Sequence, residues 1–277
     1  MNKKVSVVLG TRNDGYGDEA EKRFIFSINS MLENYDEVVV TDWNSPGPMT
    51  MIESVQEYIT KTGRLKEVVV TEDDLRSLGY NTVIPISEVH CRNIAMRRSS
   101  HTIILSSNPD VVPVSPITFP VEDDRIYITR RRDTWDFKNY SLLEFEEFYN
   151  HVKANIYSWE EKPLIPNNSG DKWSKVVCCG DFQLASRNFW FKIRGFEEGM
   201  PFRSYSDTNV QLKAHIYGAG VQFSGATICH LNHSSHNMIV GGQEFLNDDR
   251  KWVYEFTETE NDDQWGAPDY KFEERVW

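Results

Sequence analysis

The chain has 277 residues, of which 39% are hydrophobic and 26% are charged. This composition is ordinary for a folded globular protein and excludes a wholly disordered chain, and the length allows one α/β domain or two small ones. The net charge of −12 argues against nucleic acid or an anionic membrane as the main partner, so a phosphorylated ligand would need local cations or a metal ion.

The first 110 residues alternate between apolar runs and helical patterns. Runs rich in Val and Ile, without alternating polar residues, predict strands that are buried on both faces. Apolar residues at helical spacing predict helices at 20–34, 51–60 and 87–99. This order predicts an α/β fold with a mostly parallel, doubly wound central sheet and helices on both faces. The expected strands lie within residues 5–14, 37–45, 66–71 and 102–110.

The second half of the chain has a different pattern. A strand is expected at 125–130, and 141–159 reads as the best single helix, with Ser141 and Glu144 in a capping box. A strand from Gly180, a helix at 208–216 and a strand at 221–229 follow. No internal repeat or flexible linker interrupts the sequence. We therefore expect a single domain over 1–277, with halves at 1–112 and 113–246 and a C-terminal tail or lid at 247–277.

Three of the expected strands end abruptly in a small polar cluster that contains an acidic residue. These clusters end at Asp14, Ser45 and Asp110. In sheets covered by helices, ligands bind outside the carboxyl ends of the strands, where the three clusters would meet. The pattern therefore predicts a site for a ligand of the nucleotide type.

The same clusters, taken in order, resemble motifs of the GT-A fold glycosyltransferases, especially the large inverting family often numbered 2. Gly-Thr-Arg-Asn at 10–13 stands for the family's Pro-Thr-Tyr-Asn, Thr-Asp-Trp-Asn-Ser at 41–45 for Val-Asp-Asp-Gly-Ser, and Cys-Arg-Asn-Ile-Ala at 91–95 for Ala-Arg-Asn-x-Gly. The resemblance covers residues 4–233 and depends on the order and spacing of the motifs. It implies a GT-A fold, a nucleotide-binding half at 1–112 and a donor-sugar and acceptor half at 113–246.

The resemblance also implies a divalent cation, which the family holds with an Asp-x-Asp motif after the fourth strand. Here Ser-Ser-Asn at 106–108 fills that position, and Asn108-Pro109-Asp110 keeps a carbonyl group and a carboxylate two residues apart. We expect Asp110 to bind the metal, with Asn108 assisting or binding ribose, although Asn-Pro-Asp is also ordinary turn chemistry. Oxygen ligands suit Mn²⁺ or Mg²⁺, and Mn²⁺ also accepts imidazole.

A late histidine completes the cation's coordination in many metal-dependent GT-A enzymes. His230 and His233 both match this feature, and His230 is favoured because it directly follows the expected strand at 221–229. A structural zinc site would normally need Cys pairs at short spacing, and no second cluster in the sequence supplies them.

Two acidic residues match the family's catalytic half. Ser-Asp-Thr-Asn at 206–209 resembles the family's Glu-Asp-x-Asp, which implies that Asp207 is the general base that deprotonates the acceptor hydroxyl. Asp207 is also a reasonable N-cap for the following helix. Asp181 follows Gly180 in a segment that resembles the strand lining the sugar pocket. We expect it to bind donor-sugar hydroxyl groups or to be a surface acid.

The nucleotide contacts follow from the same resemblance. Asp42 matches the position that contacts the nucleoside, with Thr11 beside it, and uracil is the favoured base. Arg92 matches a pyrophosphate or nucleotide contact, and Arg12 is another local cation. Three further arginines are expected to be solvated or salt-bridged surface residues, namely Arg97, Arg98 and Arg131.

The sequence thus predicts a metal-dependent glycosyltransferase that moves a sugar from a nucleotide diphosphate donor, preferably a UDP-sugar, to the hydroxyl group of a glycan or other acceptor, with inversion. Two alternatives remain. One is a nucleotidyltransferase, although Gly-Tyr-Gly at 15–17 is a poor version of its glycine-rich loop. The other is a degenerate GT-A domain that binds sugar nucleotide or glycan without turnover, which is favoured by Ser106, Ser206 and Asn209.

The four cysteines show no framework spacing, and the adjacent Cys178 and Cys179 cannot readily form an ordinary disulfide with each other. Reduced thiols and a cytoplasmic location are therefore expected. The start of the chain resembles neither a signal peptide nor a transmembrane helix, and no apolar run is long enough to span a bilayer. We expect no integral membrane segment and no nucleic-acid partner.

Overall fold

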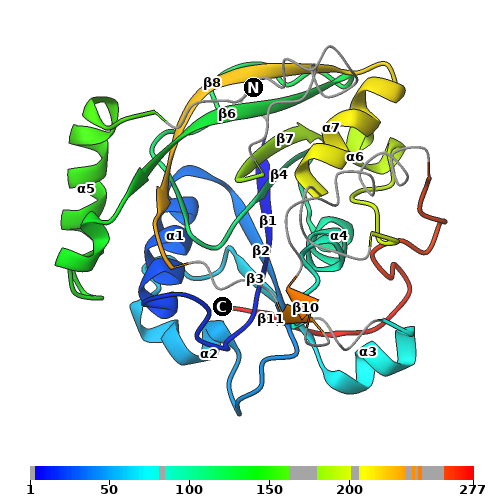
Figure 1. The fold of residues 1–277 in the computed structure, drawn as a ribbon, viewed down its shortest axis with the longest axis horizontal. Coiled ribbons are helices and arrows are strands. Elements are labelled where there is room, and N and C mark those ends of the chain that lie inside the picture. The colour runs from blue at the N-terminus through cyan, green and yellow to red at the C-terminus, as the bar shows by residue number, and fades with distance from the viewer. Residues whose placement is uncertain are drawn as a thin grey trace.

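The structure is a computed structural model, and its centre is a nine-stranded sheet with the order β11-β3-β2-β1-β4-β7-β6-β8-β5 (Figure 1). It describes residues 4–80, 85–161, 180–200, 206–234, 239–240, 243–244 and 259–277. The strands are β1 (Val5–Thr11), β2 (Glu37–Trp43), β3 (Leu65–Val70), β4 (Ile103–Ser107), β5 (Val111–Pro113), β6 (Arg125–Thr134), β7 (Phe182–Ser186), β8 (Gly220–Leu231), β9 (Ile239–Val240), β10 (Gln243–Glu244) and β11 (Glu273–Val276). The helices are α1 (Ala20–Asn34), α2 (Met51–Val55), α3 (Glu72–Leu78), α4 (Glu88–Arg98), α5 (Phe145–Asn155), α6 (Arg187–Lys192) and α7 (Ser206–Ile216), with short 3-10 helices at Gln56–Tyr58, Asp136–Asn139 and Ile156–Ser158.

The parallel strands β3, β2, β1 and β4 form the first half of the sheet, as the alternation of strands and helices predicts. Val7 of β1 pairs with Val38 of β2 on one side and with Leu105 of β4 on the other. Strand β7 is antiparallel to β4 and β6, and β8 is parallel to β6. The carboxyl ends of β1, β2 and β4 therefore lie at one edge of the sheet, where ligands bind in folds of this type.

Apolar layers cover both faces of the sheet, which confirms the predicted architecture. On one face, α1 and α5 contribute Phe24 and Phe148, whose side chains are buried. On the other face, α4, α6 and α7 contribute the buried Ile94, Trp190 and Val210. Figure 1 shows these two groups of helices on opposite sides of the sheet.

Several elements differ in extent from the predictions. Helix α1 has the predicted bounds, but the helix expected at 141–159 begins only at Phe145. The capping box is wrong because only half of it forms: the Glu144 carboxylate accepts the Ser141 backbone N–H at 2.7 Å, and Glu144 itself has non-helical backbone angles. Helix α3 was not predicted, since it buries only Leu75 and so shows no apolar stripe.

The C-terminal segment 259–277 lies along the edge of the sheet at β3, where β11 pairs antiparallel with that strand. Arg98 donates to three backbone carbonyl groups of this segment. The guanidinium carbon of Arg97 lies 3.9 Å from the centroid of the Trp265 ring. Arg98 is salt-bridged to Glu274, as expected, but the segment covers part of both arginines, so neither is simply a solvated surface residue. Residues 247–258 of the expected tail or lid lie outside the described residues, and the division of the chain into halves stays a prediction.

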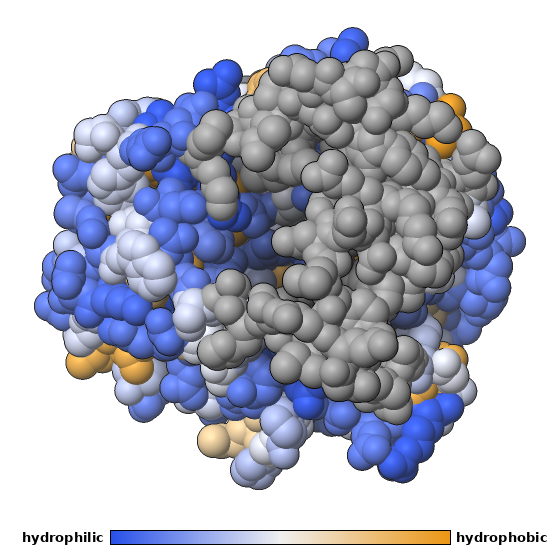
Figure 2. Space-filling view, viewed as in Figure 1, coloured by the Kyte–Doolittle hydropathy of each residue, from blue (hydrophilic) through white to orange (hydrophobic). Residues whose placement is uncertain are grey.

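The described surface on the face shown in Figure 2 is mainly hydrophilic, and its hydrophobic residues lie apart from one another. None of the described helices combines the length and the apolar character that crossing a bilayer requires. Cys91 and Cys229 are buried free thiols, and the pair Cys178 and Cys179 lies outside the described residues.

Candidate functional site

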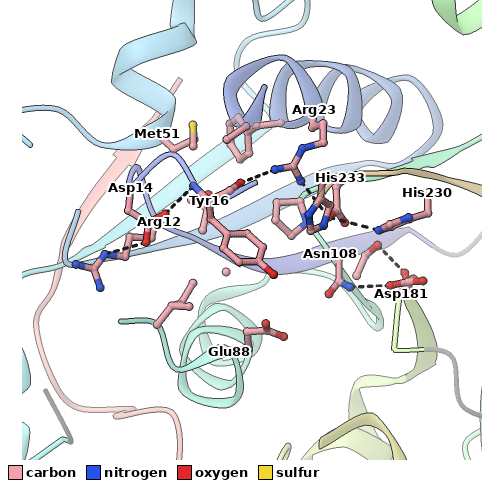
Figure 3. A pocket seen from close by; sticks show the side chains of 18 of the residues that line it. Arg12, Asp14, Tyr16, Arg23, Met51, Glu88, Asn108, Asp181, His230 and His233 are labelled. Atoms are coloured by element: carbon pink, nitrogen blue, oxygen red, sulfur yellow. Dashed lines mark hydrogen bonds and ion pairs between the residues drawn. The ribbon is translucent and has the colours of Figure 1, made fainter. Parts of the chain in front are cut away.

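A cavity of about 460 Å³ opens at the carboxyl ends of β1 and β4 (Figure 3). Side chains from the loop after β1, from α1 and α4, and from the ends of β4, β6 and β8 converge on it. Its polar and charged lining includes Thr11, Arg12, Asp14, Tyr16, Arg23, Glu88, Arg92, Ser107, Asn108, Asp110, Arg131, Asp181, His230 and His233. The cavity therefore brings together eight of the ten residues that the sequence analysis selected, all except Asp42 and Asp207.

Strand pairing brings Asp110 and His230 together across 120 residues of sequence. Asp110 lies between β4 and β5, and Val111 at the start of β5 pairs with His230 of β8. The backbone N–H of Leu231 donates to the Asp110 carbonyl oxygen at 2.9 Å. Because β5 and β8 are antiparallel, this register places the end of β8 directly beside the polar cluster that follows β4.

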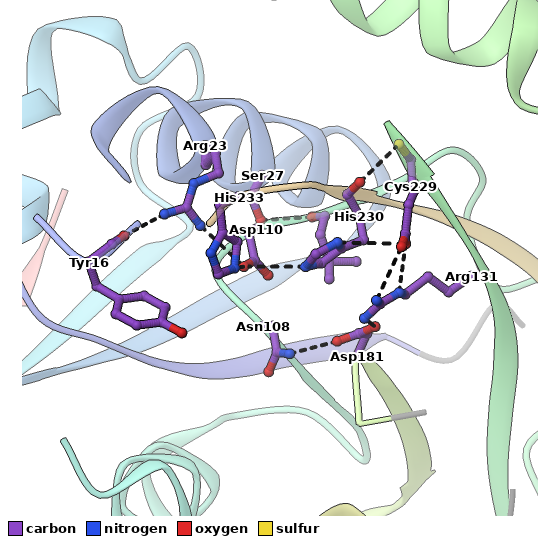
Figure 4. Close-up of polar contacts among 12 residues, drawn as sticks. Tyr16, Arg23, Ser27, Asn108, Asp110, Arg131, Asp181, Cys229, His230 and His233 are labelled. Carbon is purple, nitrogen blue, oxygen red and sulfur yellow. Dashed lines mark hydrogen bonds and ion pairs between the residues drawn. The ribbon is translucent and has the colours of Figure 1, made fainter. Parts of the chain in front are cut away.

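Asp110, His230 and His233 form a compact cluster of metal-ligating side chains (Figure 4). One ligand atom from each lies within 4.8 Å of the others. The Asp110 Oδ2 atom is 3.2 Å from His233 Nε2 and 3.6 Å from His230 Nε2. Asp110 is 8% exposed, so the cluster lies inside the protein and not on its surface.

The donor set fits a divalent cation. Burial alone would raise the pKa of Asp110, but hydrogen bonds and charge from His230, His233 and Arg23 hold it well below its usual range, so the carboxylate is ionised. Its Oδ1 atom is buried and has no hydrogen-bond partner in the part of the chain that the structure describes. His233 Nδ1 donates to the Ser234 carbonyl oxygen at 2.9 Å, which leaves the Nε2 lone pair for a cation. One carboxylate and two imidazoles suit Mn²⁺ better than Mg²⁺.

Arg131 is salt-bridged, as expected, but it lines the cavity and does not lie on the outer surface. Its guanidinium lies 2.6 Å from Asp181 and 2.7 Å from Asp133. Burial disfavours the charged form, but the two carboxylates outweigh it and raise the pKa of Arg131. The strand was expected to end at residue 130, whereas β6 continues to Thr134 and carries Arg131 and Asp133 to the site.

A second arginine, Arg92, is fixed at the floor of the cavity. It donates to Glu88 at 3.1 Å and to Asn108 Oδ1 at 2.5 Å, and it lies over the Phe196 ring. The Asn108 amide in turn donates to Asp181 Oδ1 at 2.6 Å. Asn108 thus bridges Arg92 and Asp181, and its proposed assistance to the metal or ribose stays a prediction.

Arg12 and Thr11 lie where β1 ends. Thr11 is buried and lines the cavity. Arg12 donates to the Pro85 carbonyl group, and its Nε atom lies 3.5 Å from Asp14. The hydrogen bond to Pro85 therefore joins the end of β1 to the turn before α4.

Asp42 and Asp207 do not line the cavity among the described residues, but both carboxylates are close to its walls. Asp42 Oδ2 accepts from Ser45 Oγ at 2.9 Å and from the Met51 N–H at 3.1 Å, and burial raises the pKa of Asp42. A methyl group added at Gly180 would lie 3.3 Å from Asp207 Oδ2, so Asp207 sits against the residue that precedes Asp181.

The surroundings of Asp207 disfavour its ionised form. This residue lies in the first turn of α7, and Gln183 Nε2 donates to its backbone carbonyl oxygen at 2.9 Å. Burial raises the pKa of Asp207, Arg92 opposes that shift, and the charge of Asp181 adds to it. A general base works best when its pKa is shifted toward the operating pH.

Sequence analysis missed Arg23 and Tyr16. Arg23 of α1 lies 3.3 Å from Asp110 Oδ2, and the Tyr16 ring packs edge-on against His233 with ring centroids 5.3 Å apart. Neither residue stands in a motif. The apolar spacing of α1 identifies the buried face of the helix but does not show which polar residue at its start faces a ligand.

No family model matches the chain, and no curated protein sequence matches it. Among solved structures, GalNAc-T7 with UDP, GalNAc and Mn²⁺ is similar at 14% identity and a TM-score of 0.57, over 91% of this chain and 48% of that chain. S. aureus TarS 1-349 in complex with UDP matches at 15% identity and a TM-score of 0.49, over 83% of this chain and 60% of that chain. The present chain spans about half the length of the GalNAc-T7 chain. The likeness to GalNAc-T7 shows the fold, which is of the GT-A type.

Proposed function

We propose that this protein is a metal-dependent glycosyltransferase that uses a nucleotide diphosphate donor, preferably a UDP-sugar, and a hydroxyl acceptor such as a glycan. The observation that carries the proposal is the cluster of Asp110, His230 and His233, which opens into a cavity also lined by arginines, at the ligand-binding edge of a GT-A sheet. The structure of similar fold at TM-score 0.57 contains UDP, GalNAc and Mn²⁺. The proposed location is the cytoplasm, as the cysteine pattern predicts.

In this proposal, positively charged groups bind the diphosphate of the donor, and polar or acidic groups bind its nucleoside. A divalent cation on the cluster, Mn²⁺ or Mg²⁺, would neutralise charge on the diphosphate and stabilise it as a leaving group. Arg12 and Arg92 also line the cavity and supply further positive charge. Thr11 and Asp42 are the proposed nucleoside contacts. Among the described residues Asp42 Oδ1 is buried without a hydrogen-bond partner, and Met51, whose N–H donates to Asp42 Oδ2, lines the cavity.

Asp207 and Asp181 are proposed to act on the sugars. The acceptor oxygen attacks the anomeric carbon while the bond from that carbon to the diphosphate oxygen breaks, and the bonding electrons leave with the diphosphate. Asp207 takes the proton of the acceptor hydroxyl, and direct displacement inverts the configuration. Asp181, held by Arg131 and Asn108, is positioned to accept hydrogen bonds from donor-sugar hydroxyl groups.

Product analysis tests the proposal. The protein is incubated with a panel of UDP-sugars and GDP-sugars, with Mn²⁺ or with EDTA, and with mixed glycan acceptors. Free UDP that forms only with Mn²⁺ supports a transferase. Release of pyrophosphate from a nucleoside triphosphate and a sugar phosphate would instead indicate a nucleotidyltransferase. Donor binding without release of any nucleotide would indicate a binding domain without turnover.

A further inference from the structure

The four arginines that line the cavity differ in what neutralises them. Three have a carboxylate partner outside the proposed metal cluster. For Arg23, the ion pair that the structure describes is with Asp110, at 3.3 Å. A cation bound to Asp110 would therefore take the partner of Arg23. The other pairs are Arg12 with Asp14, Arg92 with Glu88, and Arg131 with Asp133 and Asp181.

The guanidinium of Arg23 cannot turn toward solvent to avoid the cation. Arg23 is 4% exposed, and its other nitrogens donate to the backbone carbonyl groups of Asp18 at 2.9 Å and Tyr16 at 2.5 Å. Gly17 between them has φ +72°, and a methyl group there would lie 2.7 Å from Arg23 and 2.8 Å from His233. The loop after β1 therefore approaches closely enough to fix the guanidinium beside the cluster, as Figure 4 shows.

A bound cation and a fixed guanidinium would place two positive groups around one carboxylate. Like charges at this separation in a buried site repel strongly, and an anion that contacts both removes the repulsion. A diphosphate is such an anion, and arginine matches phosphate oxygens with paired N–H groups.

We propose that Arg23 is a diphosphate-binding residue that opposes cation binding in the absence of nucleotide and favours nucleotide binding once the cation is present. Cation and nucleotide then bind cooperatively through the shared carboxylate of Asp110. This inference depends on the proposed function and adds a residue and a coupling to it.

The test measures two affinities in the full chain and in Arg23→Gln. Mn²⁺ binding without nucleotide is followed by the electron paramagnetic resonance signal of free Mn²⁺, and UDP binding at saturating Mn²⁺ is followed by calorimetry. We expect Arg23→Gln to bind Mn²⁺ about tenfold more tightly and UDP about tenfold more weakly. Arg76→Gln, which removes the same charge from an exposed helix position, should change neither affinity.

Opposite changes in the Mn²⁺ and UDP affinities distinguish this role, because loss of a purely structural arginine would weaken the binding of both ligands. Weaker Mn²⁺ binding in folded Arg23→Gln, or no change in either affinity, would overturn the inference. Arg23→Lys keeps the charge but not the paired N–H groups, so the Mn²⁺ affinity should stay within about threefold of the wild type while the UDP affinity falls. A larger change of Mn²⁺ affinity in folded Arg23→Lys would also overturn it, even if Arg23→Gln does not fold. A wild type that binds neither Mn²⁺ nor UDP would instead refute the proposed function itself.

Discussion

At the scale of single residues, Asp110 is the group on which most of the site depends. Its carboxylate contacts two imidazoles and a guanidinium, and one of its oxygens has no hydrogen-bond partner among the described residues. An unpaired buried carboxylate oxygen costs free energy unless the site has a ligand for it. A divalent cation is the ligand that this set of side chains fits.

Substitution of Asp110 tests this assignment. Asp110→Asn removes the anionic ligand, so we expect Mn²⁺ affinity to fall by at least about tenfold. Asp14→Asn is a matched control, since Asp14 lines the same cavity but pairs with Arg12 and lies outside the cluster. Mn²⁺ titration of both variants measures the difference. Equal Mn²⁺ affinity in Asp110→Asn and the wild type would show that the cation binds elsewhere.

The base assignment has its own test. We expect Asp207→Asn to lower the transfer rate by about 10²–10⁴-fold and to leave UDP affinity unchanged. Because burial raises the pKa of Asp207, the wild-type rate should begin to fall at a higher pH than an exposed aspartate would give as the solution is acidified. Asp73→Asn, at an exposed position, should keep the full rate. Undiminished transfer by Asp207→Asn would rule out this residue as the base.

At the scale of elements, the C-terminal segment stabilises the helix α4, which carries a residue of the site. Arg98 of α4 donates to the carbonyl groups of Gly266, Ala267 and Tyr270, while Arg92 on the same helix faces the cavity. Loss of several such partly buried hydrogen bonds costs on the order of 2–3 kcal/mol. We expect Arg98→Ala to lower the free energy of unfolding by that amount in urea titrations.

Arg76→Ala provides the comparison for Arg98→Ala. The ion pairs that the structure describes for Arg76 are exposed and lie within α3, so its removal should change the free energy of unfolding by less than about 0.5 kcal/mol. Equal stability of the two variants would mean that the C-terminal segment does not depend on Arg98.

The strand pair β3–β11 carries a pH-dependent group. Glu67 of β3 is fully buried and accepts from Trp277 Nε1 at 3.1 Å. Burial, helped by Asp42, raises its pKa to about 7 from 4.5. A raised pKa means that the folded state binds the proton more tightly, so this stabilisation is complete below pH 4.5 and is lost as the pH rises through 7.

Glu67→Gln cannot ionise and should remove this pH dependence. In urea titrations at pH 5 and pH 8, we expect the wild type to lose on the order of 2 kcal/mol more than Glu67→Gln between the two values. Glu160→Gln, at an exposed position, should follow the wild type. The same pH dependence in wild type and Glu67→Gln would contradict the account of this edge.

The elements also show what sequence can and cannot predict. Strands β1, β2 and β4 are buried on both faces, so their unbroken apolar runs are a direct signal. Helix α3 has a capping box at Thr71 but one buried residue, and a pattern based on apolar spacing cannot find it. Sequence signals are therefore strongest where burial, rather than capping, determines the element.

At the scale of the whole molecule, the site is assembled by pairings between distant segments. The family resemblance predicted that Asp110 and His230 would be neighbours, because it supplied the topology. No local pattern predicted Arg23 or Arg131, since the start of α1 and the extension of β6 become part of the cavity only after the sheet has formed. Sequence motifs thus identified the candidate metal ligands, but not the arginines that pair with the acidic residues of the site.

The most direct test of the central claim is thermal unfolding of the wild-type protein with UDP, with Mn²⁺ and with both. A ligand that binds only the native state stabilises it by about 2.7 kcal/mol at one hundred times its dissociation constant. We predict a rise in the unfolding midpoint with UDP that requires Mn²⁺ and is absent in Asp110→Asn. No rise with any combination of nucleotide and metal, in a folded sample, would contradict the proposal of a metal-dependent nucleotide-sugar site.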